Sequence, residues 1–125
     1  MLRFPTIQEL QRVSKNKEVE KLNFNKEFLQ AYWANKSRHE FASHQSEVYY
    51  FGDQERESYS KNYIFCVRLI FEVDGKIAFT DNDLGKMKWD EANKIIEKLN
   101  QKLEAVGVTL ENANNLINEY RTHTK

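Results

Sequence analysis

The polar and apolar positions of the chain predict a helix close to the N-terminus. Apolar side chains recur at the spacing of one helix face at Ile7, Leu10 and Val13. Thr6 and Glu9 stand three residues apart, as in a capping box, where each side chain can bond to the other residue's backbone N–H. We therefore expect a helix over residues 6–16.

A second helix is predicted from Asn25 onward. Its large apolar residues have the spacing i, i+1, i+4 and i+5: Phe28, Leu29, Tyr32 and Trp33. The pattern leaves open where this helix ends, between residues 36 and 42.

The middle of the chain changes to a strand pattern. Residues 47–51 predict a strand and residues 52–62 a polar loop. Residues 63–73 are rich in β-branched and aromatic side chains and predict a longer strand. Asp74-Gly75 then indicates a hairpin, with residues 76–80 as the returning strand.

Two registers of this hairpin follow from two turn lengths. A two-residue turn places Glu72 opposite Ile77 and Phe71 opposite Ala78. A three-residue turn with Gly75 in the left-handed conformation pairs Phe71 with Ile77 instead. The second register gathers one wholly apolar face, which consists of Phe65, Val67, Leu69, Phe71, Ile77 and Phe79. Because a one-residue slip exchanges the two faces, hydrophobic burial favours the three-residue turn, with Arg68, Glu72, Lys76 and Thr80 on the opposite face.

Two helices are predicted at the end of the chain. Apolar positions between Trp89 and Val106 follow the 3.6-residue period for five turns, and Gly107 is suited to end that helix. Thr109 would cap a last helix whose apolar stripe is Leu110, Ala113, Leu116, Ile117 and Tyr120. The predicted fold is one α+β domain over residues 1–125. Its order is ααβββαα, and a small antiparallel sheet of about three strands packs against helices.

The composition favours a small cytoplasmic protein. The chain has 125 residues, of which 40% are hydrophobic, and its formal net charge is zero. It contains no apolar run long enough to cross a membrane, and its first residues lack the apolar run of a secretory signal. The single cysteine, Cys66, excludes an intramolecular disulfide and suits a reducing compartment. We expect a cytoplasmic location and no membrane partner.

The motifs of common enzyme and metal sites are missing. The four glycines do not form a phosphate-binding loop, and there is no Cys-x-x-Cys pair. Asp81-Asn82-Asp83 resembles the opening of a calcium loop, but Lys86 and Ala92 stand where that loop needs glycine and glutamate. Cys66 lies in the most apolar segment, where a packing role is expected. We therefore predict a chain without catalytic activity, metal or cofactor.

A tyrosine-rich segment is the candidate protein-binding site. Tyrosine and arginine anchor many protein interfaces, and several tyrosines here surround a charged loop. The predicted site consists of Tyr49, Tyr50, Asp53, Arg56, Tyr59 and Lys61. Strand 47–51 is also expected to be a sheet edge open to another strand. The alternative is that every second tyrosine of this strand packs inward.

Nucleic-acid binding is the second hypothesis. Residues 1–40 carry eight basic and five acidic side chains, so the N-terminal helices are positively charged. The candidate phosphate contacts are Arg12, Lys15, Lys17 and Lys21. Glutamates interrupt this segment, whereas dedicated nucleic-acid binders concentrate their charge more strongly.

The preferred hypothesis is a protein-binding module that acts by steric occlusion. Its size, Lys/Asn-rich composition and lack of catalytic motifs are typical of inhibitors and immunity proteins. Within that class the favoured version is a phage or mobile-element inhibitor of a host system, of the anti-CRISPR or another anti-defence type. The sequence leaves the target protein open. It also leaves open a homodimer formed through the edge strand or through the outer face of the last helix pair.

Overall fold

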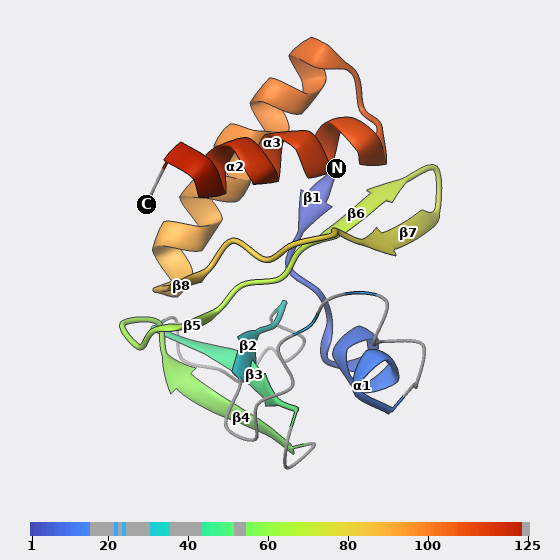
Figure 1. Ribbon diagram of the computed structural model, residues 1–125. Helices are drawn as coiled ribbons and strands as arrows, with labels where there is room; N and C mark the ends of the chain where they lie inside the picture. Colours follow the sequence, from blue (N-terminus) through green and yellow to red (C-terminus); the bar gives the residue numbers. More distant parts are fainter. Residues whose placement is uncertain (16–21, 23, 25–30, 36–43, 52–54, 124–125) are drawn as a thin grey trace.

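The computed structural model describes residues 1–15, 22, 24, 31–35, 44–51 and 55–123. Within them it has an α+β fold, as expected, with three helices and two sheets (Figure 1). The helices are α1 (Ile7–Lys15), α2 (Trp89–Val106) and α3 (Leu110–His123). One sheet has the order β1-β6-β7 and contains β1 (Leu2–Arg3), β6 (Ile70–Val73) and β7 (Lys76–Phe79). The other has the order β4-β3-β2-β5-β8 and contains β2 (Ala31–Trp33), β3 (Gln45–Tyr50), β4 (Glu55–Ser60), β5 (Phe65–Cys66) and β8 (Lys86–Met87). The predicted order ααβββαα is wrong, because short strands occupy places that were expected to be helix or loop.

The three helices with clear end signals are confirmed. At the start of α1, the Thr6 backbone N–H donates to Glu9 Oε1 at 2.8 Å, and the Glu9 N–H donates to Thr6 Oγ1 at 3.1 Å. α2 ends at Gly107, whose φ of 117° suits glycine. Thr109 Oγ1 accepts the N–H of Asn112 and so caps α3.

The predicted second helix is wrong where the structure describes it. Tyr32 and Trp33 belong to β2, while residues 25–30 lie outside the described part of the chain. β2 lies inside the five-stranded sheet, so residues 31–34 are all buried and show no alternation that would mark a strand. Successive residues nevertheless face opposite sides. Tyr32 packs near Phe24, whereas the indole N–H of Trp33 donates to the Met87 carbonyl at 3.0 Å on the other side.

The predicted polar loop contains a strand. β4 pairs with all six residues of β3, from Gln45 opposite Ser60 to Tyr50 opposite Glu55. Its sequence is polar because it is the sheet edge, and charged side chains are typical of edges that must not pair with another chain. β3 is therefore an interior strand, and the expected open edge at residues 47–51 is wrong.

The predicted long strand over residues 63–73 is divided between the two sheets. β5 belongs to the five-stranded sheet and β6 to the three-stranded one, and the buried residues 67–69 connect them. This connection bonds to the loop between β7 and β8. The Thr80 N–H donates to the Leu69 carbonyl at 3.1 Å, and the Leu84 N–H donates to the Val67 carbonyl at 2.8 Å. The two arms of one long hairpin thus pass from one sheet into the other.

The hairpin turn has two residues, so the predicted three-residue turn is wrong. Asp74 and Gly75 have φ values of 51° and 77°, and Glu72 lies opposite Ile77. Two left-handed residues in succession match the right-handed twist of the flanking strands. Burial of Ile77 does not decide the register, because β7 is a sheet edge, where Ile77 keeps 45% of its surface exposed.

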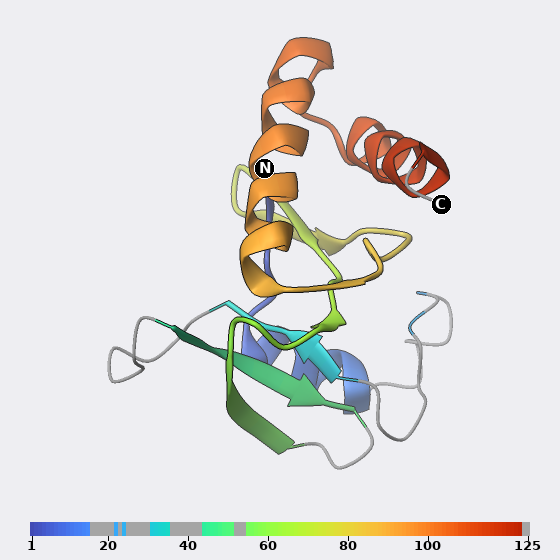
Figure 2. The same ribbon diagram turned by 90° about the vertical axis from the view of Figure 1, so that its left-hand side faces the viewer.

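The core has two parts, one on each face of the five-stranded sheet. On one face α1 contributes Ile7, Leu10 and Val13 to a cluster with Tyr32, Tyr49 and Cys66. On the other face α2 and α3 pack with the three-stranded sheet, as Figure 2 shows from the side. β1 is held between β6 and α2, because the Asn100 side chain accepts the Leu2 N–H and donates to the Leu2 carbonyl. No helix in the described part of the chain is long and apolar enough to cross a membrane.

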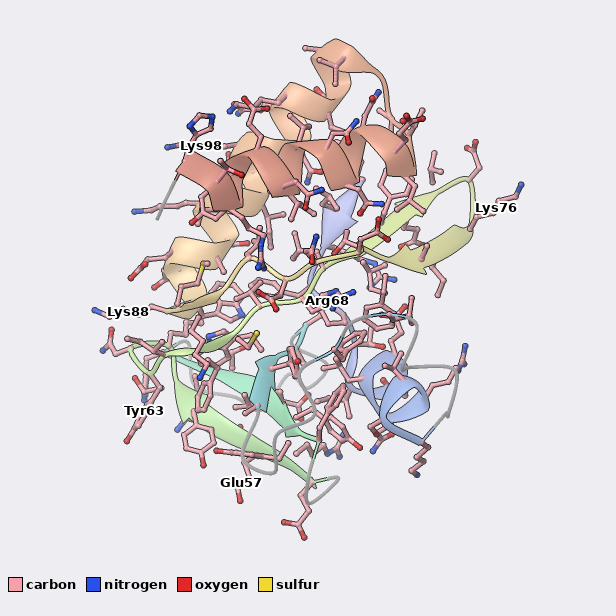
Figure 3. The ribbon with its side chains drawn as sticks, in the orientation of Figure 1. Glu57, Tyr63, Arg68, Lys76, Lys88 and Lys98 are labelled. Atoms are coloured by element: carbon pink, nitrogen blue, oxygen red, sulfur yellow. The ribbon has the colours of Figure 1, made fainter. Side chains whose placement is uncertain are left out.

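Arg68, expected on a polar sheet face, is completely buried at the junction of the sheets (Figure 3). Its Nε donates to the Thr80 carbonyl at 2.7 Å, and one terminal nitrogen donates to the Leu22 carbonyl at 2.5 Å. The guanidinium also lies 4.2 Å from the ring centroid of Phe24. Burial lowers the pKa of Arg68, and the charge of Asp83 opposes this shift.

We expect Arg68→Met to lower the free energy of unfolding by at least about 2 kcal/mol, because two carbonyls then lose a charged hydrogen-bond donor. Arg68→Lys should also be destabilising, since one ammonium group does not reproduce the fork of guanidinium donors. Urea denaturation measures both, with the exposed Arg12→Lys as the control that stays like wild type. A wild-type midpoint for Arg68→Met would contradict this role.

The Arg3–Glu9 ion pair makes stability depend on pH. Arg3 Nη1 lies 2.8 Å from Glu9 Oε1. Burial acts to raise the pKa of Glu9, but hydrogen bonds from Arg3 and Thr6 outweigh it and hold the pKa below its ordinary value of 4.5. The stabilisation from Glu9 is therefore complete above pH 4.5 and is lost as the pH falls through the lowered pKa.

We expect the loss of stability of the wild type below pH 4.5 to be steeper than that of Glu9→Gln, which cannot titrate at this position. Denaturant unfolding at about pH 7, 4.5 and 3 measures the difference. Glu91→Gln, at an exposed position in the first turn of α2, is the control. The role of Glu9 is contradicted if Glu9→Gln and wild type lose stability in parallel.

Candidate functional site

The register of β3 and β4 divides the predicted protein-binding residues between two faces of the sheet. Tyr49 lies opposite Arg56, and neighbouring residues along a strand point to opposite faces. Tyr49 is buried against the α1 side, where its hydroxyl lies 2.8 Å from Ser14 Oγ. Tyr50 and Tyr59 are on the other face. The alternative in which every second tyrosine packs inward is thus confirmed for Tyr49.

Arg56 lies on the opposite face of the sheet from Tyr50 and Tyr59. The exposed Arg56 extends on the face of Tyr49, with its Nε 3.9 Å from Oε1 of the buried Glu47. Asp53 lies outside the described residues. Of the six predicted residues, the structure brings Tyr50 and Tyr59 together and places Lys61 just beyond the end of β4.

Four aromatic rings form a continuous group, here called the aromatic patch: Tyr50, Tyr59, Tyr63 and Phe65. The ring centroid of Tyr59 lies 6.3 Å from that of Tyr50, 5.3 Å from that of Tyr63 and 5.0 Å from that of Phe65. Tyr63 and Phe65 are stacked with an interplanar angle of 19°. Phe65 also meets Trp33 edge to face, so the patch rests on the core.

The patch continues to the surface at the turn between β4 and β5. Tyr63 is 55% exposed and its neighbour Ile64 is 59% exposed, whereas Phe65 is half-buried. Figure 3 shows Tyr63 projecting from the turn that precedes β5. Tyr63 belongs to the tyrosine-rich segment 49–63 expected to bind protein, although it is not one of the six predicted site residues. Ile64 and Phe65 were not predicted, although the apolar run Tyr63-Ile64-Phe65 after a polar segment could have indicated them.

Hydrogen bonds fix the tyrosine hydroxyls of the patch. Tyr50 Oη donates to Tyr59 Oη at 2.9 Å, and Tyr59 Oη donates to Glu57 Oε2 at 2.7 Å. The bond from Tyr50 and the bond to Glu57 both raise the pKa of Tyr59, so its hydroxyl stays protonated at neutral pH. This arrangement orients the rings and keeps the patch neutral except at Glu57.

Lysines border the patch on the side of α2. The Lys61 ammonium lies 4.3 Å from the ring centroid of Trp89, and Trp89 stacks on Phe4 at 5.4 Å. The backbone N–H of Trp89 also donates to the Lys61 carbonyl at 3.3 Å and so connects the turn to the start of α2. Lys88 is exposed on the same side (Figure 3).

The predicted nucleic-acid residues are placed only in part. Arg12 and Lys15 are both exposed in the last turn of α1. Lys17 and Lys21 lie outside the described residues. Two basic side chains therefore share this surface.

Metal-ligating and nucleophilic groups do not gather in the part of the chain that the structure describes. There, no group of three or more His, Cys, Asp and Glu side chains could hold a metal ion. Cys66 is buried, and burial, aided by the charge of Asp83, raises the pKa of its thiol to about 12. A thiol held in this form at neutral pH is a packing group and a poor nucleophile.

Comparison of the chain with protein-family models, with curated proteins and with solved structures finds no match. Of the four large apolar side chains exposed on the described surface, Tyr63 and Ile64 are adjacent and lie at the aromatic patch.

Proposed function

We propose that this chain is a non-enzymatic protein-binding module that acts by steric occlusion and docks through the aromatic patch. The observation that carries the proposal is the exposure of Tyr63 and Ile64, each by more than half, beside rings that are already packed. Burying such side chains against a partner releases apolar surface from water, and aromatic residues dominate binding energy in many interfaces.

The side chains of the patch are packed against one another before binding, which supports the same proposal. The rings contact one another, and the Tyr50–Tyr59–Glu57 hydrogen bonds fix their orientation. A partner then loses less free energy in ordering these side chains. Glu57, Lys61 and Lys88 surround the apolar centre with both signs of charge, an arrangement that orients a partner and accelerates association.

The inhibitor class expected from the sequence is a narrower form of this proposal. In it the occluded partner is a component of a host defence system, and the chain comes from a phage or mobile element; an immunity protein that occludes a toxin is the other form. The anti-defence inhibitor and the immunity protein would act in the same way, since each covers a functional surface of its target and catalyses no reaction.

The test is affinity capture from host lysate with tagged wild type and the double variant Tyr63→Ala/Ile64→Ser. The wild type should retain a stoichiometric protein after nuclease treatment and at two salt concentrations. The double variant should bind this protein at least about thirtyfold more weakly, since removing a central anchor costs about 2 kcal/mol. Ile77→Ser, at an exposed apolar position on β7, is the matched control and should bind normally.

Circular dichroism and the thermal midpoint must show that both variants are folded. Equal binding by the double variant and Ile77→Ser would exclude the aromatic patch as the docking site. If only salt-labile nucleic acid is recovered, and Arg12→Ala/Lys15→Ala abolishes its binding, the protein-binding proposal fails in favour of the nucleic-acid alternative.

A further inference from the structure

A groove lies between α2 and α3, on a different part of the molecule from the aromatic patch. It encloses about 260 Å³. Its apolar floor consists of Ile95, Leu99, Leu116 and Tyr120, and its rim of Lys98, Lys102, Glu119 and His123. α3 crosses α2 steeply (Figure 1), and side chains from both helices line the groove.

The two walls of the groove differ in charge. The α2 wall carries Lys98 and Lys102, both exposed, while the α3 wall carries Glu119. Within the described residues, none of these three side chains has an ion-pair partner within 4.0 Å. The rim therefore offers opposite charges from opposite walls.

This arrangement is complementary to itself. In a dimer with twofold symmetry, the same surface of each copy meets its counterpart, so a contact between one residue and another occurs twice. If the groove of one copy faces the groove of a second and the twofold axis runs along the groove, the α2 wall of each lies against the α3 wall of the other. Lys98 and Lys102 then face Glu119 of the second copy.

Apolar surface continues beyond the groove along α2. Ile95, Leu99 and Val106 lie at positions i, i+4 and i+11, on one flank of the helix. Val106 is 60% exposed. The chain's net charge of zero also removes the long-range repulsion that keeps highly charged proteins apart.

We infer that the α2–α3 groove is the interface of a homodimer, in which the groove of one copy packs against that of a second. The apolar floors bury one another, and the Lys98–Glu119 contacts across the axis set the register. The occupant is a second copy of this chain, because the rim supplies both signs of charge that such a copy needs.

The first measurement is the mass of the full chain by light scattering and sedimentation over a range of concentrations. The mass should rise toward twice the 14.9 kDa of one chain. Lys98→Glu and Glu119→Lys should each raise the dissociation constant at least about tenfold, because each places like charges across the axis. Lys76→Glu and Glu104→Lys make the same charge changes at exposed positions outside the groove and should leave the dimer unchanged.

A mixing experiment separates contacts between copies from contacts within one chain. When the Lys98→Glu and Glu119→Lys variants are mixed, the two substituted positions meet each other across the axis with opposite charges. The second contact of the same heterodimer joins the unchanged Lys98 of one chain to the unchanged Glu119 of the other. The heterodimer should therefore recover most of the lost affinity. The thermal midpoint of each variant establishes that it is folded.

A monomeric mass at every concentration would overturn the inference. So would a dimer that both groove variants leave intact, which would place the interface elsewhere, and so would a mixture of them that stays monomeric. The Tyr63→Ala/Ile64→Ser variant should dimerise normally. The mass measurements therefore test the groove alone, and the capture of a partner protein tests the aromatic patch.

Discussion

The buried guanidinium of Arg68 is the interaction on which the arrangement of the two sheets depends. The chain leaves the five-stranded sheet after β5 and enters the three-stranded sheet at β6, and the regular ladder is interrupted between them. Backbone carbonyls at such a junction have no water to bond to, and leaving them unpaired in the interior is costly. Arg68 donates to the carbonyls of Thr80 and Leu22 there, so one side chain joins three segments that are distant in sequence.

This junction also determines where the exposed surfaces lie. Because the long hairpin passes through both sheets, β5 is fixed in the five-stranded sheet and the turn before it ends beside β4. That position brings Tyr63 and Phe65 against Tyr59. The other arm of the hairpin leads from β7 through residues 80–85 to β8 and α2. Arg121 of α3 donates to the carbonyl and the carboxylate of Asp83 in that loop, so one side of α3 is held by the loop. The other side of α3 lines the groove.

The parts of the fold that sequence reasoning predicted are those with local causes. The Thr6–Glu9 capping box, the glycine after α2 and the Thr109 cap each depend on residues within one turn of helix. The errors arise where tertiary contacts decide. Residues 31–33 form a strand whose two faces are both buried, and residues 55–60 form one because β3 supplies the pairing partner. The segment around Arg68 changes sheets at a point where the Arg68 guanidinium bonds to carbonyls from distant parts of the chain.

The candidate site shows the same limit at the level of single residues. Proximity in sequence grouped Tyr49 with Tyr50, but alternation along β3 separates them by the full thickness of the sheet. Tyr49 lies on the face that α1 covers, where its hydroxyl meets Ser14. Tyr50 is left on the face where Tyr59 and Phe65 are its neighbours. Residue type therefore pointed to a group of aromatic side chains with charges at its border, while strand pairing selected which aromatic residues compose it.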